Sequence, residues 1–164
     1  MKILDIITVD SPKAAILRRK AKAVRSVTPR IQQLIDAMVE TMRANHGLGL
    51  AAPQVGEGVR VIVAEVGDRL LALVNPEIVA AEGEEVGEEG CLSIPGILAE
   101  VRRAFRVRVR ALNRRGRRVT VDAEGLLARV LQHEIDHLDG ILITDRVDDP
   151  SKIRTITEKV EALS

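Results

Sequence analysis

Two stretches with strict two-residue alternation, joined by a short turn, most constrain how this chain folds. In FRVRVRAL, residues 105 to 112, apolar and basic side chains alternate, and RRVTVDAE, residues 117 to 124, alternates in the same way. Successive side chains of a β-strand point to opposite faces, so each stretch predicts a strand with one buried face. The intervening NRRG predicts a tight turn, and together the three segments predict an antiparallel hairpin.

A second pair of strand-like stretches precedes this hairpin. VRVIVAEV (59 to 66) and RLLALVN (69 to 75) are separated only by Gly67-Asp68, which predicts another hairpin. Residues 82 to 90, EGEEVGEEG, carry five glutamates and predict the end of a strand followed by a loop.

Helices are predicted on both sides of the strands. In the first, Thr28 has the properties of an N-cap, Pro29 those of the first helical residue, and the helix should end near residues 45 to 47. The apolar residues spaced for one buried face of this helix are Ile31, Leu34, Ile35, Met38 and Met42. A second helix should end at Gly140, and a short polar helix is predicted after Pro150.

Strands joined by hairpins and bracketed by helices predict an α+β fold rather than parallel βαβ units. We expect mostly antiparallel sheets packed around a central helix that carries the sequence HEIDH, with an N-terminal helix and a short C-terminal helix. A chain of 164 residues fits one domain with a sizeable core, so residues 1 to 164 are expected to form a single domain.

The composition limits the core, the compartment and the partners. Trp and Tyr are absent and Phe105 is the one aromatic residue, so the core must be aliphatic. The net charge of +1 indicates no particular partner, and a single cysteine excludes an internal disulfide and fits a reducing compartment. No apolar run approaches the roughly 20 residues of a membrane span, and no signal-peptide pattern is present, so we expect a cytoplasmic protein without membrane contact.

The stretch QHEIDHLDG holds two of the three histidines of the chain. On an α-helix His133 and His137 lie one turn apart on the same face, so both imidazoles can bind one metal ion. Glu134 adjoins the first histidine, where a carboxylate can take a proton from a water that the metal activates. Leu126 and Val130 continue the histidine face, which indicates that this face is buried. The alternative is a chance spacing on a solvated helix.

Two histidines do not complete a catalytic metal site, which normally has three protein ligands. A third histidine three residues past the glycine would complete a known extended motif, but Ile143 stands there. His46 and Cys91 therefore remain as candidates. Cys91 lies in EEGCLSIPG, which predicts a bent loop able to bring a thiolate to a site built elsewhere. On composition alone, a small buried hydrophobic residue is the more common role of a lone cysteine.

The stretch HGLGLAAPQVG, residues 46 to 56, matches the glycine spacing of a dinucleotide-binding loop, but its context is wrong. That loop needs a strand before it and a helix after it, whereas here a helix precedes and Pro53 interrupts any helix that follows. The glycines instead indicate that the backbone passes close to another group. Gln54 follows, and its neutral amide is a good donor to an oxyanion; the alternative is a tight turn with an exposed glutamine.

Three segments combine at this point: GLGLAAPQ (47 to 54), EGCLS (89 to 93) and QHEIDHLDG (132 to 140). In this order and spacing they closely resemble the three signature motifs of the peptide deformylases. The resemblance extends to LVNPEI and EGLLARVLQHE and covers the chain from about Ile31 to Arg146. It is looser before Val27.

The resemblance implies a role for each matching residue. It implies three metal ligands, Cys91, His133 and His137. It implies that Glu134 is the general acid and base. The implied oxyanion donors are the Gln54 amide and the backbone N–H of Leu92.

On the substrate side, the resemblance implies that the backbone of Gly49 pairs with the peptide. The implied pocket for the substrate methionine is formed by Leu48, Leu126, Val130 and the ring of His133. Arg103 matches an arginine that pairs with the glutamate of EGCLS, here Glu89. The chain departs from the usual pattern at Arg102, where proline is common, and at Leu98 and Phe105, two variable positions near the substrate.

The resemblance implies a single catalytic domain that removes formate from the N-terminal formyl-methionine of newly made polypeptides. One divalent metal ion is implied, Fe²⁺ in the cell, with Zn²⁺, Ni²⁺ or Co²⁺ as alternatives. The expected partners are formyl-methionyl nascent peptides, and we expect a monomer. The alternative functions are a general HExxH metallopeptidase and an RNA-binding module with a structural metal.

Seven arginines between Arg106 and Arg118 support the RNA-binding alternative. Alternation places Val107 and Val109 on one face of the strand and Arg106 and Arg108 on the other. This basic face is either a solvated surface balanced by the glutamates of residues 82 to 89, or a weak contact with ribosomal RNA.

Overall fold

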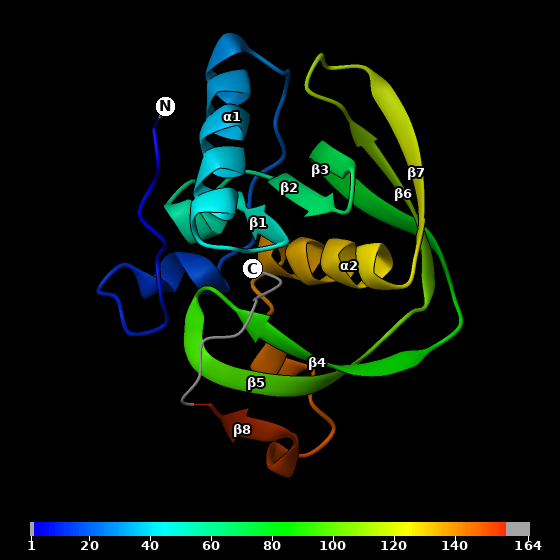
Figure 1. Ribbon diagram of the computed structural model, residues 1–164. Coiled ribbons are helices and arrows are strands. Elements are labelled where there is room, and N and C mark those ends of the chain that lie inside the picture. The colour runs from blue at the N-terminus through cyan, green and yellow to red at the C-terminus, as the bar shows by residue number, and fades with distance from the viewer. Residues whose placement is uncertain (1, 157–164) are drawn as a thin grey trace.

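The computed structural model describes residues 2–156 and has an α+β fold with two antiparallel sheets (Figure 1). The five-stranded sheet contains, in spatial order, β1 (Gly49–Ala51), β2 (Val61–Val66), β3 (Arg69–Glu82), β6 (Arg106–Leu112) and β7 (Arg118–Glu124). The three-stranded sheet contains β4 (Glu85–Cys91), β5 (Ile94–Arg103) and β8 (Ile153–Thr155). The helices are α1 (Pro29–Ala44), α2 (Leu126–Leu138) and the short 3₁₀ segments η1 (Ala14–Arg18), η2 (Ala52–Val55), η3 (Ile143–Asp145) and η4 (Pro150–Lys152).

Both predicted hairpins are confirmed. Strands β2 and β3 pair antiparallel, and β6 pairs with β7 from Arg106 opposite Glu124 to Leu112 opposite Arg118. In β6 the valines are buried and the arginines are exposed, as the alternation predicts. Phe105 lies just before β6 and is 38% exposed, so it does not join the buried valine face.

The prediction of a loop for residues 82 to 90 is wrong. Strand β3 continues to Glu82, and the glutamate-rich segment after it forms β4, which pairs with β5. Arginines outside the segment pair with its glutamates: Arg102 on β5 pairs with Glu84, just before β4, and Arg154 on β8 pairs with Glu88 on β4. Opposite charges on the strands of one sheet stabilise it, so a run of glutamates can form a strand here.

The prediction of a short helix after Pro150 is wrong for the residues that directly follow this proline. Pro150–Lys152 forms a single 3₁₀ turn, and Ile153–Thr155 then pairs with β5 as strand β8. Two of the three β8 residues are β-branched, which favours a strand. The remainder of the predicted helix, residues 157 to 164, lies outside the described residues.

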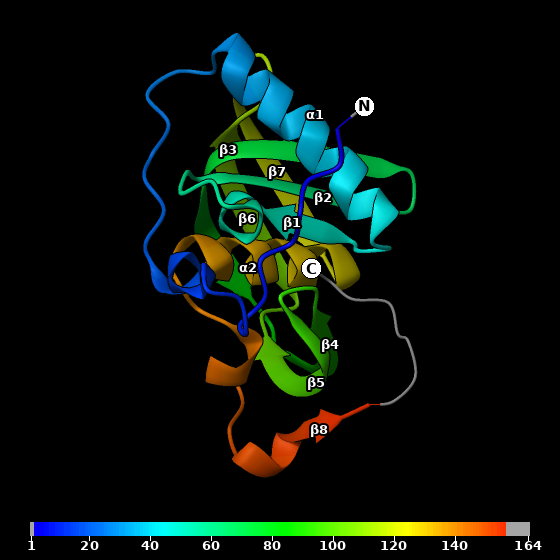
Figure 2. The same cartoon turned by 90° about the vertical axis from the view of Figure 1, so that its left-hand side faces the viewer.

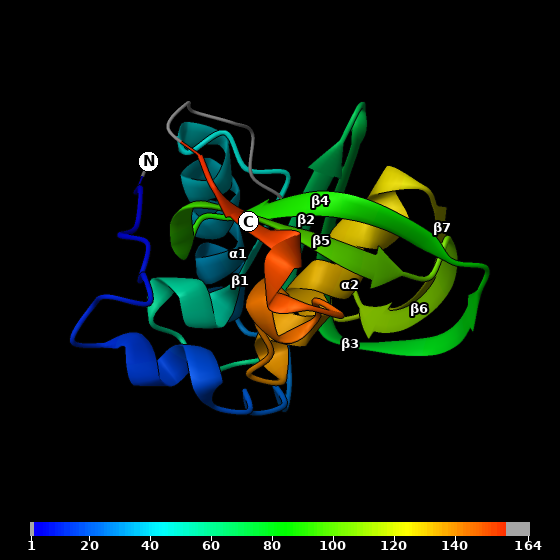
Figure 3. The ribbon, with the colours of Figure 1, turned by 90° about the horizontal axis from the view of Figure 1, so that it is seen from below.

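Helix α1 has the predicted start, since the Thr28 hydroxyl accepts a hydrogen bond from the Ile31 N–H and Pro29 is the first helical residue. Helix α2 lies between the two sheets (Figures 1 and 2). Figure 3, seen from the side of the three-stranded sheet, shows β4 and β5 passing in front of α2. Residues on α2 can therefore meet residues from both sheets.

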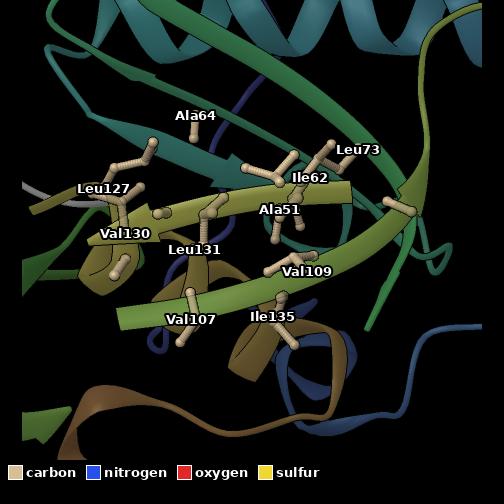
Figure 4. Close-up of a cluster of buried hydrophobic side chains, with 14 of the residues drawn as sticks. Ala51, Ile62, Ala64, Leu73, Val107, Val109, Leu127, Val130, Leu131 and Ile135 are labelled. Atoms are coloured by element: carbon tan, nitrogen blue, oxygen red, sulfur yellow. The ribbon is translucent and has the colours of Figure 1, made fainter. Parts of the chain in front are cut away.

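The largest group of buried side chains lies between the five-stranded sheet and α2 (Figure 4). Ile62, Leu73 and Val109 from the sheet pack with Val130 and Leu131 from α2. The core is aliphatic, as the composition predicts. Among residues 2–156, no helix is long and apolar enough to cross a membrane.

Candidate metal centre

Two elements that are distant in sequence bring three potential metal ligands together. Cys91 is the last residue of β4, at the tip of the β4–β5 hairpin, and His133 and His137 lie on successive turns of α2. All three are buried, and one ligand atom from each lies within 4.8 Å of the others. The Sγ atom of Cys91 lies 3.5 Å from Nε2 of His137. His46 is exposed and does not belong to this cluster, so the geometry favours Cys91 as the third ligand.

The donor atoms of this cluster fit a metal ion. Nδ1 of His133 lies 2.9 Å from Oε1 of Glu89, while Nε2 of the same ring is buried and has no hydrogen-bond partner within residues 2–156. A buried polar nitrogen without a partner is costly, and a cation held between the three side chains would satisfy it. Two imidazoles and a thiolate suit Zn²⁺, Fe²⁺, Ni²⁺ or Co²⁺.

The protonation of the cluster also depends on a cation. Burial, together with the negative charges of Glu134 and Glu89, raises the pKa of the Cys91 thiol. Burial is the main cause that lowers the pKa of His137, so this ring stays neutral and keeps a free electron pair. A divalent cation would reverse the effect at the cysteine, because it stabilises the thiolate.

Glu89 fixes the orientation of His133. Its side chain is fully buried and accepts hydrogen bonds from His133, from Nε and NH2 of Arg103, and from NH1 of Arg129. Burial alone would raise the pKa of Glu89, but the hydrogen bonds from His133 and Arg103 outweigh it and hold this pKa at about 2. The ionised carboxylate requires the proton of His133 on Nδ1, which leaves Nε2 for a metal.

Glu134 lies deep in the site beside β1. Its side chain is buried, and a Cβ atom added at Gly49 would lie 2.5 Å from Oε2 of Glu134. Gly49 therefore leaves the space that the Glu134 carboxylate occupies. The sequence predicted that the glycines pass close to another group, and the structure identifies that group as Glu134.

Gln54 is buried on η2, which contradicts the alternative of an exposed glutamine in a turn. Its Oε1 atom accepts a hydrogen bond from the Ala51 N–H at 3.0 Å. Its Nε2 atom donates to Ser93 Oγ at 3.1 Å and lies 3.9 Å from Cys91 Sγ. These contacts hold the amide N–H₂ beside the metal cluster. Sequence reasoning missed Ser93, although it lies within the EGCLS motif.

The residues expected on the substrate side differ in burial. Val130 is fully buried and Leu48 is partly exposed, whereas Leu126, the first residue of α2, is 48% exposed. The prediction that the whole histidine face of the helix is buried is therefore wrong at Leu126. Leu98 is buried, and Arg102 pairs at the surface with Glu84 and Asp148.

A cavity of about 550 Å³ lies elsewhere, at the N-terminal end of α1. None of the candidate site residues lines it. Its volume is in the range of ligand sites, but its lining contains neither cysteine nor histidine. The chemistry of the side chains, rather than the size of a cavity, locates the candidate site.

A thiol and two imidazoles buried together beside a carboxylate are typical of metal-dependent hydrolases. The chain also matches the family model of the polypeptide deformylases over residues 3–153. This match covers most of the chain, and the chain therefore belongs to the polypeptide deformylase family.

Individual relatives agree with this assignment. A peptide deformylase of Desulfitobacterium hafniense is 50% identical over 152 residues, which cover 93% of this chain and 99% of the relative. One from Acetivibrio thermocellus is 58% identical over 132 residues, covering 80% and 78%. The crystal structure of the peptide deformylase from Thermotoga maritima, 43% identical, matches with a TM-score of 0.85 over 91% of this chain and all of that chain. That of the Synechococcus elongatus enzyme in complex with actinonin, 39% identical, matches with a TM-score of 0.86 over 93% and 85%.

Proposed function

We propose that this chain removes the formyl group from the N-terminal formyl-methionine of newly synthesised polypeptides and releases formate. The observation that carries the proposal is the buried Cys91, His133 and His137 cluster beside Glu134, in a chain that matches the family over residues 3–153. We propose that residues 1 to 164 act as a single catalytic domain with α2 as its central helix. Nascent chains are made in the cytoplasm, where this enzyme would act as a monomer.

Cys91, His133 and His137 would hold one divalent cation, Fe²⁺ in the cell. When bound, this cation would supply Lewis acidity and lower the pKa of a water molecule toward about 7. Zn²⁺, Ni²⁺ and Co²⁺ are alternatives, because imidazole and thiolate ligands suit all of them.

Glu134 would carry the proton of the reaction. It would accept a proton from the attacking water as the new carbon–oxygen bond forms at the formyl carbon. It would then return the proton to the amine nitrogen as the carbon–nitrogen bond breaks, since one group can serve first as base and then as acid. Its burial against Gly49 supports this role, because the carboxylate has one defined place beside the cluster.

The oxyanion that develops on the formyl oxygen would be stabilised by Gln54 and by the backbone N–H of Leu92. The Gln54 amide is already held at both ends, by Ala51 and by Ser93, so its donor needs no reorientation during the reaction. Removing one such donor typically slows turnover by about 10²–10³-fold.

The substrate peptide would bind along β1. Among residues 2–156 this edge strand pairs only with β2, so its other edge would be able to receive an extended peptide. Leu48, Val130 and the ring of His133 would receive the methionine side chain. Leu126 would form the outer rim of this pocket, and this position would explain why its side chain is exposed.

An anaerobic assay of formate release from a formyl-methionyl peptide tests the proposal, with metal analysis of the same sample. Cleavage of the formyl group without cleavage of internal amide bonds is expected. Cleavage of an internal amide bond would instead support a general metallopeptidase, and metal binding without any hydrolysis would support a structural metal.

A ribosome contact through the β6–β7 hairpin is a further part of the proposal. Arg106 pairs with Glu82 and Glu124, and Arg108 pairs with Asp122, so the outer face of β6 is largely neutralised. The arginines of the hairpin that form no ion pair within residues 2–156 are Arg110, Arg115, Arg117 and Arg118. Three of these four lie at the turn end of the hairpin, and we infer that this end makes the weak contact with ribosomal RNA.

A further inference from the structure

Arg129 is a buried arginine on α2, one turn before His133. Its side chain extends to the three-stranded sheet. Its NH1 atom donates to Glu89 Oε2 at 2.6 Å and to the Val101 carbonyl oxygen at 3.0 Å. Its NH2 atom donates to the Glu85 carbonyl oxygen at 2.8 Å. These three acceptors all lie on β4 or β5, so this one side chain ties α2 to the hairpin that carries Cys91.

The bond from Arg129 completes the coordination of Glu89. Oε1 of Glu89 is within 2.9 Å of both Arg103 NH2 and His133 Nδ1. Oε2 accepts from Arg103 Nε at 2.9 Å and from Arg129 NH1. A carboxylate offers about four acceptor positions, and all of those on Glu89 are filled. The carboxylate that orients His133 can therefore neither rotate nor tilt without breaking a charge-assisted hydrogen bond.

Strand β4 leaves space for the Arg129 guanidinium. Gly87 faces it, and a Cβ atom added there would lie 3.3 Å from both Cζ and NH2 of Arg129. Any larger residue at position 87 would press on the guanidinium. The glycine in the glutamate-rich segment thus has a local function.

The potential metal ligands lie on two separate elements, the β4–β5 hairpin and α2. Backbone hydrogen bonds within each element do not fix the distance between the two. Cys91 is on the hairpin, and the two histidines are on α2. Arg103 on β5 forms a second buried tie, because its NH1 atom donates to Asp136 on α2 at 2.6 Å. Arg129 thus extends from α2 to the three-stranded sheet, and Arg103 extends from that sheet to α2.

We propose that Arg129 is a positioning residue of the metal centre, which holds the Glu89 carboxylate and the β4–β5 hairpin against α2 and so sets the place of Cys91 relative to His133 and His137. This inference rests on the metal site of the proposed function. A loss of Arg129 would leave one acceptor position of a buried carboxylate empty and loosen the hairpin that brings the thiolate.

Metal release tests the proposal without any substrate. The protein and its Arg129→Met and Arg129→Lys variants are loaded with Co²⁺ under anaerobic conditions, and the transfer of the ion to a chelator is followed with time. Residues that support a ligand typically change metal affinity by about 10–100-fold, so release from Arg129→Met should be about 10-fold faster or more. The thiolate-to-Co²⁺ absorption band should also shift. Arg129→Lys should release the ion faster than the unsubstituted protein, because a lysine cannot reproduce the three bonds.

Arg154→Met is the matched control. Arg154 pairs with Glu88, next to Glu89 on β4, through two hydrogen bonds, but this pair is exposed. The control removes the partner of Glu88, a glutamate of the same strand as Glu89. It does not touch the carboxylate that orients His133. Its Co²⁺ spectrum should be unchanged and its release rate within about two-fold, as for a surface pair.

Gly87→Ala is the second variant, and it keeps the proposal testable if Arg129→Met does not fold. It leaves every hydrogen-bonding side chain in place and displaces only the guanidinium, so it should speed Co²⁺ release several-fold.

Folded Arg129→Met or Gly87→Ala protein with an unchanged release rate and spectrum would overturn the proposal. The same holds for a variant that melts at a lower temperature but keeps both properties below its melting transition, since Arg129 would then serve stability alone. Absence of formate release from the unsubstituted protein would reject the proposed function and leave these measurements valid.

Discussion

At the scale of single residues, Glu134 is the side chain whose role can be separated most cleanly from metal binding. It is not among the three clustered ligand residues, so Glu134→Gln should retain the metal. Turnover should fall by about 10²-fold or more, as expected for lost acid–base catalysis. Metal analysis and formate release on the same sample measure both quantities. Loss of the metal along with the activity would make Glu134 a structural residue instead.

Cys91 should behave in the opposite way. Cys91→Ala removes one of three clustered ligand atoms, so metal content and deformylation should disappear together. A variant that kept a full equivalent of metal and near-normal turnover would show that the third ligand is another residue. Spacing and composition alone left His46 as an alternative to Cys91, and only the resemblance to the peptide deformylases pointed to Cys91. The physical reason is the β4–β5 hairpin, which brings position 91 to α2.

Gly49 offers a test of how closely Glu134 is placed. In Gly49→Ala the new methyl group would lie 2.5 Å from Oε2 of Glu134 and must displace the carboxylate. Misplacing a catalytic group by about 1 Å can cost about 10²-fold in rate, so turnover should fall at least 10-fold while the metal stays bound. Gly58→Ala is the matched control, because a Cβ there meets nothing within 4 Å. Equal turnover of the two variants would contradict the tight contact at Gly49.

At the scale of elements, the accuracy of prediction depended on whether a segment is stabilised by its own pattern or by distant partners. Strands β6 and β7 were predictable because their alternation and their turn are local. Strand β4 was not, because the arginines that neutralise Glu88 and Glu89, which are Arg154, Arg103 and Arg129, are not adjacent to it in the sequence. Arg129 was missed for a related reason. An arginine within the apolar run LLARVL could have suggested a buried partner, but nothing in the sequence points to Glu89.

The junction between α2 and the N-terminal segment depends on Gly140. Its φ of +74° favours glycine, and a Cβ atom there would lie 2.5 Å from the Arg18 carbonyl oxygen. Gly140→Ala combines backbone strain with a steric clash, and a loss of about 2–4 kcal/mol in the free energy of unfolding is expected. Gly67→Ala is the control, because Gly67 also has positive φ but its Cβ would meet nothing within 4 Å. Denaturant unfolding should show the smaller loss at Gly67, and equal losses would mean that strain alone acts at Gly140.

At the scale of the whole molecule, acidic and basic side chains are paired across the surface more evenly than the arginine-rich sequence suggested. Arg106 and Arg108 are matched by carboxylates on β3 and β7, and Arg114 pairs with Asp36 on α1. The outer face of β6 is therefore mostly balanced by opposite charges, but the expected partners at residues 82 to 89 contribute only Glu82, and the other two carboxylates are Asp122 and Glu124 of β7. Within the β6–β7 hairpin, the arginines without an ion pair in residues 2–156 lie mainly at the turn end.

This distribution changes which arginines should matter for the ribosome. Arg115→Glu combined with Arg117→Glu should weaken ribosome co-sedimentation at low salt, because neither arginine is in an ion pair within the described residues. Arg106→Glu combined with Arg108→Glu makes the same change in net charge and should have a smaller effect, because both arginines are already neutralised. Binding should fall steeply as salt rises, since each arginine–phosphate contact releases counterions. Turnover on a short formyl-peptide should stay the same in both double variants. Co-sedimentation that is absent, or that responds equally to the two pairs, would reject the contact at the turn and leave the hairpin as a solvated surface.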